Sequence, residues 1–406
     1  MNSSARAGDK GQVRDEGPVR SPLVLMIVAD AFEHDPRIEK QAATLLKYGF
    51  DVTVLGWNRF GTSRGDEVRA GVRIRRATIL NPRGSGWRTL IRLPRLFWWF
   101  LRTALHTPYD ALVCHDMFTW PVGWMLRLLT RRRTVFDAHE PYAEQLVGIL
   151  PGVGSVVGLL RACEGFLARR ADALITVTPA LVDRYRLMGI QGVFYLPNVP
   201  SLTAFIPVEL DRSPRRHTPF VIGRVGGISP GYSGIEPLIE IGRELRGRGL
   251  DVRIVLGGPV MKGWDAAFEG LLQGARSFVR YVGIVPYARL PEVTREFDLV
   301  ASLREGVLPE TVYGISTKLL DAMALSIPVV STRVGEDQEL VARTGAGILI
   351  DYPISIRGSA DAIENLIRDS ELRRALGANG RRAVARELNW EHYEGDYCSL
   401  VVRTKE

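Results

Sequence analysis

Cysteine is scarce in this chain of 406 residues, and long hydrophobic runs are absent. The three cysteines are too few and too scattered for a disulfide framework, and no C-x-x-C pair offers a zinc site. No stretch approaches about 18 uninterrupted apolar residues, so we expect no membrane-spanning helix. The first twenty residues are polar and lack the apolar segment of an export signal. These absences favour a protein of the reducing cytoplasm.

Several short motifs of common enzyme classes are also missing. No predicted strand is followed by G-x-G-x-x-G, and the chain has no G-x-x-x-x-G-K-[ST] and no H-E-x-x-H. This is evidence against P-loop nucleotide hydrolases and zinc metalloproteases. No D-x-D pair is present either, which weakens a mechanism that holds a diphosphate through a chelated metal.

Positive charge is concentrated in the first half of the chain. The net charge is +8; residues 21–200 hold 23 basic and 15 acidic groups, and residues 201–406 hold 26 and 27. A basic half favours an anionic surface or ligand, although arginine used for solubility explains it equally well. We expect no nucleic-acid partner, because no nucleic-acid motif accompanies the charge.

Strands and helices alternate along most of the chain, which predicts parallel sheets covered on both faces. Strands are expected at 23–29, 51–56, 72–76, 110–114, 134–137, 173–177 and 193–196, and then at 220–225, 252–256, 278–282, 299–302, 328–331 and 347–350. Helices are expected at 33–48, 88–106, 120–130, 155–170, 180–188, 235–247, 264–275, 317–325, 360–367, 371–388 and 390–402.

A break in this alternation divides the chain into two α/β halves. Residues 196–219 contain five prolines, a composition typical of an interdomain connection. We therefore expect a disordered tail at 1–20, a first domain at 21–198, a linker at 199–218, a second domain at 219–386 and a terminal helix within 387–406. Two such halves leave a cleft between them, where ligands bind at the carboxyl ends of the strands.

The most informative segment is 312–331. Gly314, Ser316 and Thr317 precede a short predicted helix that carries Lys318 and Asp321 in its first turns. The free N–H groups of a helix start favour an anion, and a lysine adds a full charge. A carboxylate one turn later can accept hydrogen bonds from ribose hydroxyls. The segment predicts a nucleotide-diphosphate site, with an ordinary capped helix as the alternative.

Five segments together resemble a retaining glycosyltransferase of the GT-B fold, family four. They are "VLMIVADAFEHDPRIEKQAATLLKYGFDVTVL", "VFDAHEPYAEQL", "ADALITVTPAL…LPNVP", "YVGIVPYARLPEVTREFDLVAS" and "STKLLDAMALSIPVVS…GAGILI". The resemblance implies two Rossmann-like domains that face a central cleft, of which the first binds the acceptor and the second the nucleotide-sugar donor. It also implies that the terminal helix, entered through Trp390, crosses back to the first domain.

Carried onto this chain, the resemblance assigns the donor site to the second domain. Asp321 stands where the family has the glutamate that binds ribose, and Tyr313 occupies the position of the family's other glutamate. Glu305 and Glu310 are the candidates for that missing acid, and Glu305 is placed with the catalytic residues.

The family's pair of basic residues on the diphosphate is matched in part. Arg224 follows a glycine as the family's arginine does, but Ser233 stands where a lysine or arginine is usual. Either Arg224 and Lys318 hold the diphosphate alone, or Arg304 contributes. Ser316 and Thr317 complete the expected donor site.

In the first domain, the resemblance points to His139 as a catalytic residue near the reacting carbon. A neutral imidazole can orient a sugar hydroxyl or move a proton; the alternative is a histidine fixed by Asp137 or Glu140. His115 and Asp116 form a second pair expected to face the cleft, and with Glu140 they are assigned to the acceptor side. Residues 35–37 match a family loop against the donor phosphates, which makes Arg37 an anion-binding candidate; the alternative is an exposed first-turn residue.

Residues 83–102 interleave arginines with Trp98 and other aromatic side chains. Such a stretch suits an anionic membrane surface, and the alternative is a sheet-covering helix interrupted at Pro94. Residues 131–133 add three more arginines to this half.

Together, the residues and the resemblance imply a retaining transfer of a hexose from a nucleotide diphosphate sugar to a hydroxyl of a glycan or lipid-linked acceptor, in cell-envelope or exopolysaccharide biosynthesis. We expect neither a metal ion nor a cofactor, and a place in the cytoplasm or at the inner face of the membrane. A nucleotide-sugar epimerase, a phosphorylase and a non-catalytic glycan-binding protein on the same fold remain alternatives.

Overall fold

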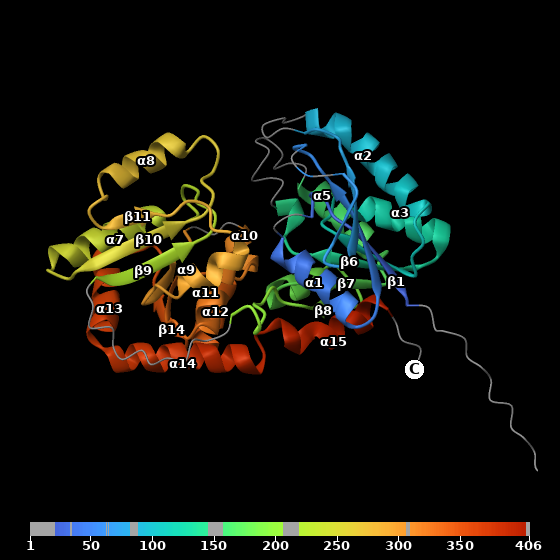
Figure 1. Cartoon of the computed structure of the whole chain (residues 1–406). Helices are drawn as coiled ribbons and strands as arrows, with labels where there is room; N and C mark the ends of the chain where they lie inside the picture. Colours follow the sequence, from blue (N-terminus) through green and yellow to red (C-terminus); the bar gives the residue numbers. More distant parts are fainter. Residues whose placement is uncertain are drawn as a thin grey trace, which may run out of the picture.

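The chain folds into two lobes, each built on its own sheet (Figure 1). A computed structural model describes residues 21–32, 35–61, 63, 65–81, 88–144, 157–205, 219–305 and 309–402. The expected tail at 1–20 lies outside these residues. Within the described part of the chain, no helix is long and apolar enough to cross a bilayer.

The first lobe holds an eight-stranded sheet of order β3-β4-β2-β1-β5-β6-β7-β8, parallel except for the pairing of β3 with β4. Its strands are β1 (Leu23–Ile27), β2 (Asp51–Trp57), β3 (Glu67–Arg69), β4 (Val72–Ala77), β5 (Ala111–His115), β6 (Arg133–Ala138), β7 (Ala173–Thr176) and β8 (Val193–Tyr195). Its helices are α1 (Pro36–Lys47), α2 (Arg88–Leu105), α3 (Trp120–Thr130), α5 (Val157–Ala168) and α6 (Pro179–Leu187). One apolar core joins α2, α3, α5 and α6 to one face of the sheet, and another joins α1 to the opposite face.

The second lobe holds a six-stranded parallel sheet of order β11-β10-β9-β12-β13-β14. The strands are β9 (Phe220–Val225), β10 (Val252–Gly257), β11 (Val279–Tyr281), β12 (Leu299–Ser302), β13 (Val329–Thr332) and β14 (Gly347–Ile350). The helices are α7 (Ile235–Gly247), α8 (Asp265–Gln273), α9 (Leu290–Thr294), α10 (Pro309–Tyr313), α11 (Thr317–Ala324), α12 (Gly335–Thr344), α13 (Ile356–Arg368) and α14 (Ser370–Arg386), with a short 3₁₀ turn at Tyr287–Arg289.

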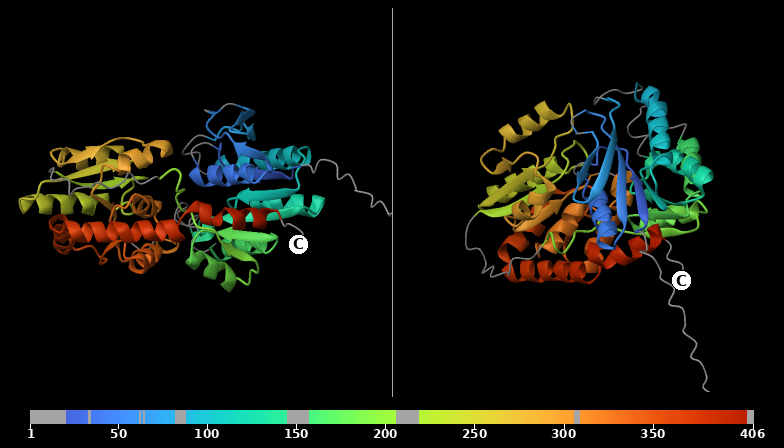
Figure 2. Two further views of the ribbon diagram at one scale, coloured as in Figure 1. Left: turned by 60° about the horizontal axis from the view of Figure 1, so that its bottom comes forward. Right: turned by 45° about the vertical axis from the view of Figure 1, so that its right-hand side comes forward.

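The last helix returns to the first lobe. Figure 2 shows α14 along the second lobe and α15 (Trp390–Val401) beneath the first. Asn389 caps α15 by accepting a hydrogen bond from the backbone N–H of His392. The indole N–H of Trp390 then donates to the Thr44 hydroxyl on α1 at 2.7 Å. Residues 199–205 belong to the same contact, because Val199 and Phe205 are buried in the core that spans both lobes.

Two local expectations are wrong. Helix α2 runs through Pro94 without interruption, because Leu96, Phe100 and Leu101 bury against the sheet and this packing outweighs the hydrogen bond that proline cannot donate. The short antiparallel strand β3 and the helices α9, α10 and α12 have no counterpart among the expected elements. The remaining expected elements are present, with ends that differ by a few residues.

Candidate active site

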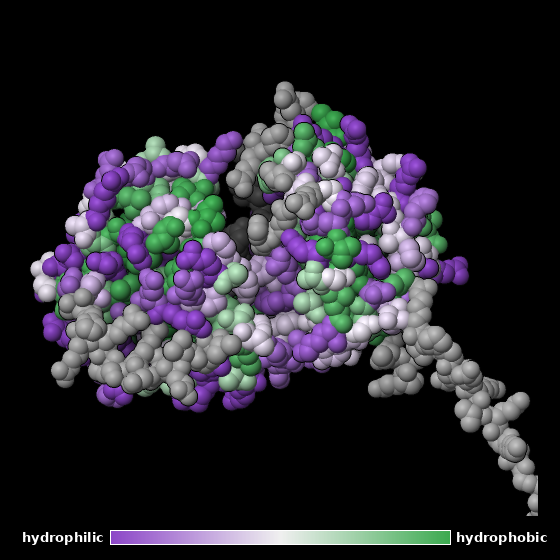
Figure 3. Space-filling view, in the orientation of Figure 1, coloured by the Kyte–Doolittle hydropathy of each residue, from purple (hydrophilic) through white to green (hydrophobic). Residues whose placement is uncertain are grey.

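A pocket lies where the two lobes face each other, and Figure 3 shows the hollow between them. Both lobes line it. The first lobe contributes Asp35, Arg37, His139, Glu140, Val177, Thr178, Tyr195, Pro197, Asn198 and Val199, and the second contributes Tyr232, Arg304, Gly314, Ile315, Thr317, Leu320 and Leu388. The sequence-predicted residues Arg37, His139, Glu140 and Thr317 therefore meet at one place.

Three basic side chains gather at the start of α11. Burial, together with the neighbouring Arg224 and Arg304, lowers the pKa of Lys318 to about 7. Lys318 lies against Gly226, where an added Cβ would come within 2.2 Å of the lysine Cε. Gly226 also has φ +150°, a conformation that L-residues rarely adopt. The glycine therefore makes room for the lysine, and mutual repulsion of the three cations favours an anion at this place.

Arg224 has a different role from the expected one of binding the diphosphate. Its guanidinium donates to the backbone carbonyls of Ser233 at 2.8 Å, Gly227 at 2.9 Å and Gly226 at 3.3 Å. The side chain is 3% exposed, and burial lowers its pKa to about 10. Arg224 therefore shapes the loop between β9 and α7 and adds positive potential from behind, and it does not line the pocket.

Arg304 is the basic residue of this group that lines the pocket, and its side chain is 11% exposed. Its Nη1 donates to the carbonyl of Gly314 at 2.7 Å, and its Nε lies 3.3 Å from the carboxylate of Asp337. Asp337 also accepts a hydrogen bond from the backbone N–H of Ser316 at 2.6 Å. Burial raises the pKa of Asp337, and Arg304 opposes that rise.

The two hydroxyls at the start of α11 differ. Ser316 is 1% exposed, and its hydroxyl accepts a hydrogen bond from Ser302 at 3.1 Å. The Ser316 side chain is therefore held inside the lobe and does not line the pocket. Thr317 is exposed and lines the pocket.

Asp321 lies below the pocket rather than on its wall. Its side chain is buried, and burial raises its pKa to about 7 against the opposing effect of Lys40 and Lys318. Lys40 comes from α1 of the other lobe and stands 5.6 Å from the Trp390 ring centroid. Asp321 is thus placed where the lobes meet, one helical turn from Lys318.

The two candidates for the missing acid, Glu305 and Glu310, lie in different elements of the structure. Glu305 is half-buried after β12, and burial together with Glu236 raises its pKa. Its Oε1 is buried without a hydrogen-bond partner, yet Glu305 is not among the residues that line the pocket. Glu310 belongs to α10, and its side chain lies outside the described residues.

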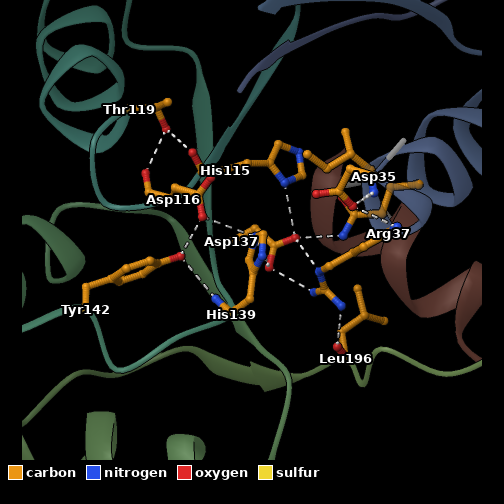
Figure 4. Close-up of polar contacts among 11 residues, drawn as sticks. Asp35, Arg37, His115, Asp116, Thr119, Asp137, His139, Tyr142 and Leu196 are labelled. Carbon is orange, nitrogen blue, oxygen red and sulfur yellow. Dashed lines mark hydrogen bonds and ion pairs between the residues drawn. The ribbon is translucent and has the colours of Figure 1, made fainter. Parts of the chain in front are cut away.

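On the first lobe, a buried ion pair organises the wall (Figure 4). Arg37 donates to both carboxylate oxygens of Asp137, at 2.8 and 3.1 Å, and to the carbonyl of Leu196 at 3.1 Å. Arg37 is 2% exposed and Asp137 is fully buried. Burial alone would raise the pKa of Asp137, but Arg37 and the two nearby histidines hold it well below its usual range. Arg37 is therefore neither an exposed residue nor a free anion site, because Asp137 neutralises its charge.

His115 and His139 each lie near a different carboxylate oxygen of Asp137. The Nδ1 atom of His115 lies 3.4 Å from Asp137, and the Nε2 atom of His139 lies 3.9 Å from it. His115 is fully buried, so the expectation that it faces the cleft is wrong; the strand end turns its ring inward. His139 retains 19% of its side-chain exposure and lines the pocket. Glu140 lines the pocket beside it.

A tyrosine that the sequence did not single out holds the His139 loop. The Tyr142 hydroxyl accepts a hydrogen bond from the His139 backbone N–H at 3.2 Å and donates to Asp116 at 3.1 Å. Asp116 lies 4.0 Å from the Nε2 atom of His139 and has φ +65°. Asp116 and Asp137 therefore approach the same imidazole nitrogen, and Asp116 is not itself a pocket-lining residue.

Two family models match the chain. The "Glycosyl transferase 4-like domain" matches residues 35–198, and "Glycosyl transferases group 1" matches residues 219–369. Together they span well over half of the chain. The chain is a group 1 glycosyltransferase.

Known relatives agree with this family. This glycosyltransferase is 29% identical to the D-inositol 3-phosphate glycosyltransferase of Corynebacterium diphtheriae over 323 residues, which is 73% of each chain. Sucrose-phosphate synthase from Thermosynechococcus elongatus has 18% identity and a TM-score of 0.75, over 93% of this chain and 98% of that one. HepE from Anabaena in complex with UDP-glucose has 18% identity and a TM-score of 0.69 over the same shares. The fold is therefore GT-B, as the sequence predicts.

The lobes of the glycosyltransferase touch beside the pocket. The Thr178 hydroxyl, at the start of α6, donates to the carbonyl of Tyr313 at 2.7 Å. The carboxylate of Glu336, from α12, accepts the backbone N–H of Ala180 at 2.8 Å. Burial raises the pKa of Glu336, and the N–H of Ala180 opposes that rise. Glu336 thus binds the positive end of a helix of the other lobe.

Proposed function

We propose that this glycosyltransferase transfers a hexose, with retention of anomeric configuration and without a metal ion, from a nucleotide diphosphate sugar to a hydroxyl of a glycan or lipid-linked acceptor. The context would be cell-envelope or exopolysaccharide biosynthesis in the cytoplasm. The observation that carries the proposal is a pocket lined by Arg304 from one lobe and His139 from the other, with Lys318 and Arg224 close to Arg304 but outside the lining. UDP-glucose is the first donor to test, because HepE binds it.

The basic cluster would carry the diphosphate. Lys318 sits at the start of α11, where free N–H groups also favour an anion. As the bond to the sugar breaks, negative charge grows on the leaving diphosphate, and preplaced cations stabilise it without rearrangement. Three cations supply the neutralisation that a divalent metal gives in other transferases. Asp321, which is buried beside the pocket, would bind the ribose only after its carboxylate turns toward the pocket.

His139 would act on the opposite side of the sugar. It alone of the two histidines reaches the pocket, and its loop is held by Tyr142. An imidazole there can accept a hydrogen bond from, or donate one to, a sugar hydroxyl beside the reacting carbon. Retention rests on the resemblance to family four. Closure of the lobes would exclude water and suppress hydrolysis of the donor.

The donor site is tested by calorimetry with UDP and other nucleoside diphosphates. Lys318→Ala should weaken the affinity by about 10–100-fold, because a charge-assisted hydrogen bond is worth about 1.5–3 kcal/mol. Asp321→Ala should weaken nucleotide binding more than binding of inorganic pyrophosphate, which has no ribose. The matched control is Lys262→Ala, an exposed lysine of the same lobe. Unchanged binding in both test variants would disprove the donor site.

A lipid-linked acceptor is supported by the outer surface of α2. Its exposed stripe carries Ile91, Arg95, Trp98, Arg102 and Leu105, so apolar and basic side chains alternate on one line. Trp98 is 63% exposed and Ile91 is 61% exposed. Aromatic and aliphatic groups in such a stripe enter the headgroup region while arginines bind lipid phosphates. Residues 83–87, which begin the predicted membrane-binding segment 83–102, lie outside the residues that the structure describes.

Membrane binding is tested by co-sedimentation with vesicles of anionic and of zwitterionic lipid. The native protein should prefer the anionic vesicles, and Ile91→Ala with Trp98→Ala should reduce its bound fraction several-fold. Ile284→Ala is the matched control, because this isoleucine is 70% exposed on the other lobe. Equal binding to both kinds of vesicle, or no effect of the double variant, would contradict the proposal while leaving the donor site untouched.

A further inference from the structure

Two histidines and an aspartate converge behind the pocket wall. His115 ends β5, Asp137 lies opposite it on the neighbouring strand β6, and His139 follows two residues later (Figure 4). One nitrogen of each imidazole and one oxygen of the carboxylate all lie within 4.8 Å of one another. Adjacent parallel strands thus bring three metal-ligand side chains together from separate parts of the chain.

Three imidazole nitrogens at this cluster are buried and make no hydrogen bond: both ring nitrogens of His115 and the Nε2 atom of His139. The Nδ1 atom of His115 lies 3.4 Å from the carboxylate of Asp137. His115 is fully buried, so solvent does not satisfy it. A buried polar atom without a partner costs about 1–3 kcal/mol, and its presence calls for a ligand or ordered water.

The carboxylate between the rings has acceptor capacity left for an ion. Each carboxylate oxygen offers two lone pairs. The Oδ1 atom of Asp137 accepts one hydrogen bond, from Arg37, whereas Oδ2 accepts one from Arg37 and one from Gln41. The Nε2 atom of His139 lies 3.9 Å from Oδ1, and Nδ1 of His115 lies 3.4 Å from Oδ2. Ligands of one tetrahedral zinc ion lie about 3.3–3.6 Å apart, so the side chains would have to close separations of up to 4.8 Å to bind one ion.

The surroundings of the cluster are acidic on the side of the pocket. The carboxylate of Asp116 lies 4.0 Å from Nε2 of His139. Asp30 and Asp35 lie nearby, and Asp35 lines the pocket. These negative charges offset the positive charge of Arg37. When an ion binds, the guanidinium of Arg37 would stay hydrogen-bonded to Asp137 as a neighbour of the metal ligand. An ion would enter from the pocket, because His139 is the partly exposed member of the three.

We propose that His115, Asp137 and His139 bind a zinc ion, and that bound zinc blocks glycosyl transfer by engaging His139. Two imidazoles and one carboxylate suit Zn²⁺ and disfavour Mg²⁺, which prefers oxygen ligands. The ion takes no part in the proposed transfer reaction. It would make the enzyme sensitive to free zinc, and this second claim rests on the role of His139 in the proposed function.

The binding claim is tested by calorimetry on the full chain after chelator treatment, with Zn²⁺ and Mg²⁺ as the probes. We expect saturable binding of one Zn²⁺ per chain, no comparable binding of Mg²⁺, and a rise in melting temperature with Zn²⁺. His139→Gln and His115→Asn should each weaken zinc affinity at least about tenfold. The control is His392→Ala, an exposed histidine of α15, which should bind zinc like the native chain.

The results separate the two claims. Absence of saturable zinc binding, or equal binding in the His139→Gln variant, would overturn the site, and His139→Gln suffices if the buried His115 variant does not fold. For inhibition, zinc should lower the transfer rate and a chelator should restore it. Zinc binding without inhibition would overturn the second claim alone, and zinc binding in a chain that fails to transfer sugar would leave the metal site standing while disproving the proposed function.

Discussion

The two walls of the pocket handle charge in opposite ways. On the first lobe, the basic residue Arg37 is paired with Asp137 and buried, and the acids and the histidine that line the pocket, Asp35, Glu140 and His139, are half-buried. On the second lobe, Lys318 and Arg304 stand near Arg224 with Asp337 as the nearby acid, and burial costs the lysine part of its charge. One wall is therefore neutralised within the fold, whereas the other is left short of negative charge. An anionic ligand would supply the negative charge that the second wall lacks. The first wall needs no such charge.

Breaking the pair on the first wall should have the largest effect. Asp137→Asn leaves the guanidinium of Arg37 buried without a counter-charge, so the free energy of unfolding should fall by about 3–5 kcal/mol. The control is Asp172→Asn, whose partner Arg127 is 38% exposed and whose loss should cost about 1 kcal/mol or less. Chemical denaturation measures both.

The Arg37–Asp137 pair also predicts how the stability of the protein changes with pH. The pKa of Asp137 is lower in the folded state than in the unfolded state, so its contribution is complete above the unfolded value of about 3.9 and is lost as pH falls through the folded value. The difference in stability between the native chain and Asp137→Asn should therefore shrink only in acid. A difference of 1 kcal/mol or less at pH 7 would contradict a buried, compensated pair.

On the second wall, removing a charge should stabilise the protein. The pKa of Lys318 falls from its ordinary 10.5 to about 7 in the folded state. Below pH 7 the folded state bears the full cost of the buried ammonium; between pH 7 and 10.5 the unfolded state binds more protons, so stability rises with pH. Lys318→Met should therefore raise the melting temperature most at or below pH 7, and progressively less above it.

The lysine prediction has a matched control and a clear contrary result. Lys262→Met changes an exposed lysine of the same lobe and should leave the melting temperature unchanged at every pH. If Lys318→Met lowered the melting temperature, or raised it equally at pH 6 and pH 9, the second wall would not be short of negative charge. If Lys318→Met is more stable but no longer binds nucleotide, then the buried charge that lowers stability is also the charge that binds the nucleotide.

A smaller effect should follow from loosening the first wall. Tyr142→Phe removes the hydroxyl that joins the His139 backbone to Asp116, so stability should fall by about 1 kcal/mol. The transfer rate kcat should fall about tenfold with little change in the donor KM, because His139 is displaced while the basic cluster is intact. Tyr109→Phe is the control: its hydroxyl contacts Thr130, so a similar loss of stability should come with a normal kcat.

The alternation of strands and helices could be predicted from sequence because each element carries its own pattern. Helix α11 begins at the expected residue, since the serine, threonine and lysine at its start are local signals. The sequence does not predict which charged side chains are paired and buried, because the partners are distant in sequence. Arg37 and Asp137, for example, are 100 residues apart. Arg224 and Arg37 look like free cations until the fold supplies their acceptors. Tyr142 carries no signature, because a tyrosine in a loop is ordinary until its hydroxyl finds two partners.

The smallest effect is expected where the two walls touch. Glu336→Gln keeps an acceptor for the N–H of Ala180 but removes a charge whose burial outweighs its contact with the start of α6, so stability at neutral pH should rise by about 1 kcal/mol or less. The folded state raises the pKa of Glu336, and a raised acid makes stability fall as pH rises from about 4.3 through the folded value. The variant should lose that slope in denaturation measured across this range, whereas Glu339→Gln, at an exposed site on the same helix, should keep it. If both variants kept the slope, ionisation of Glu336 would not be its source, and the buried charge would have no effect on the contact between the lobes.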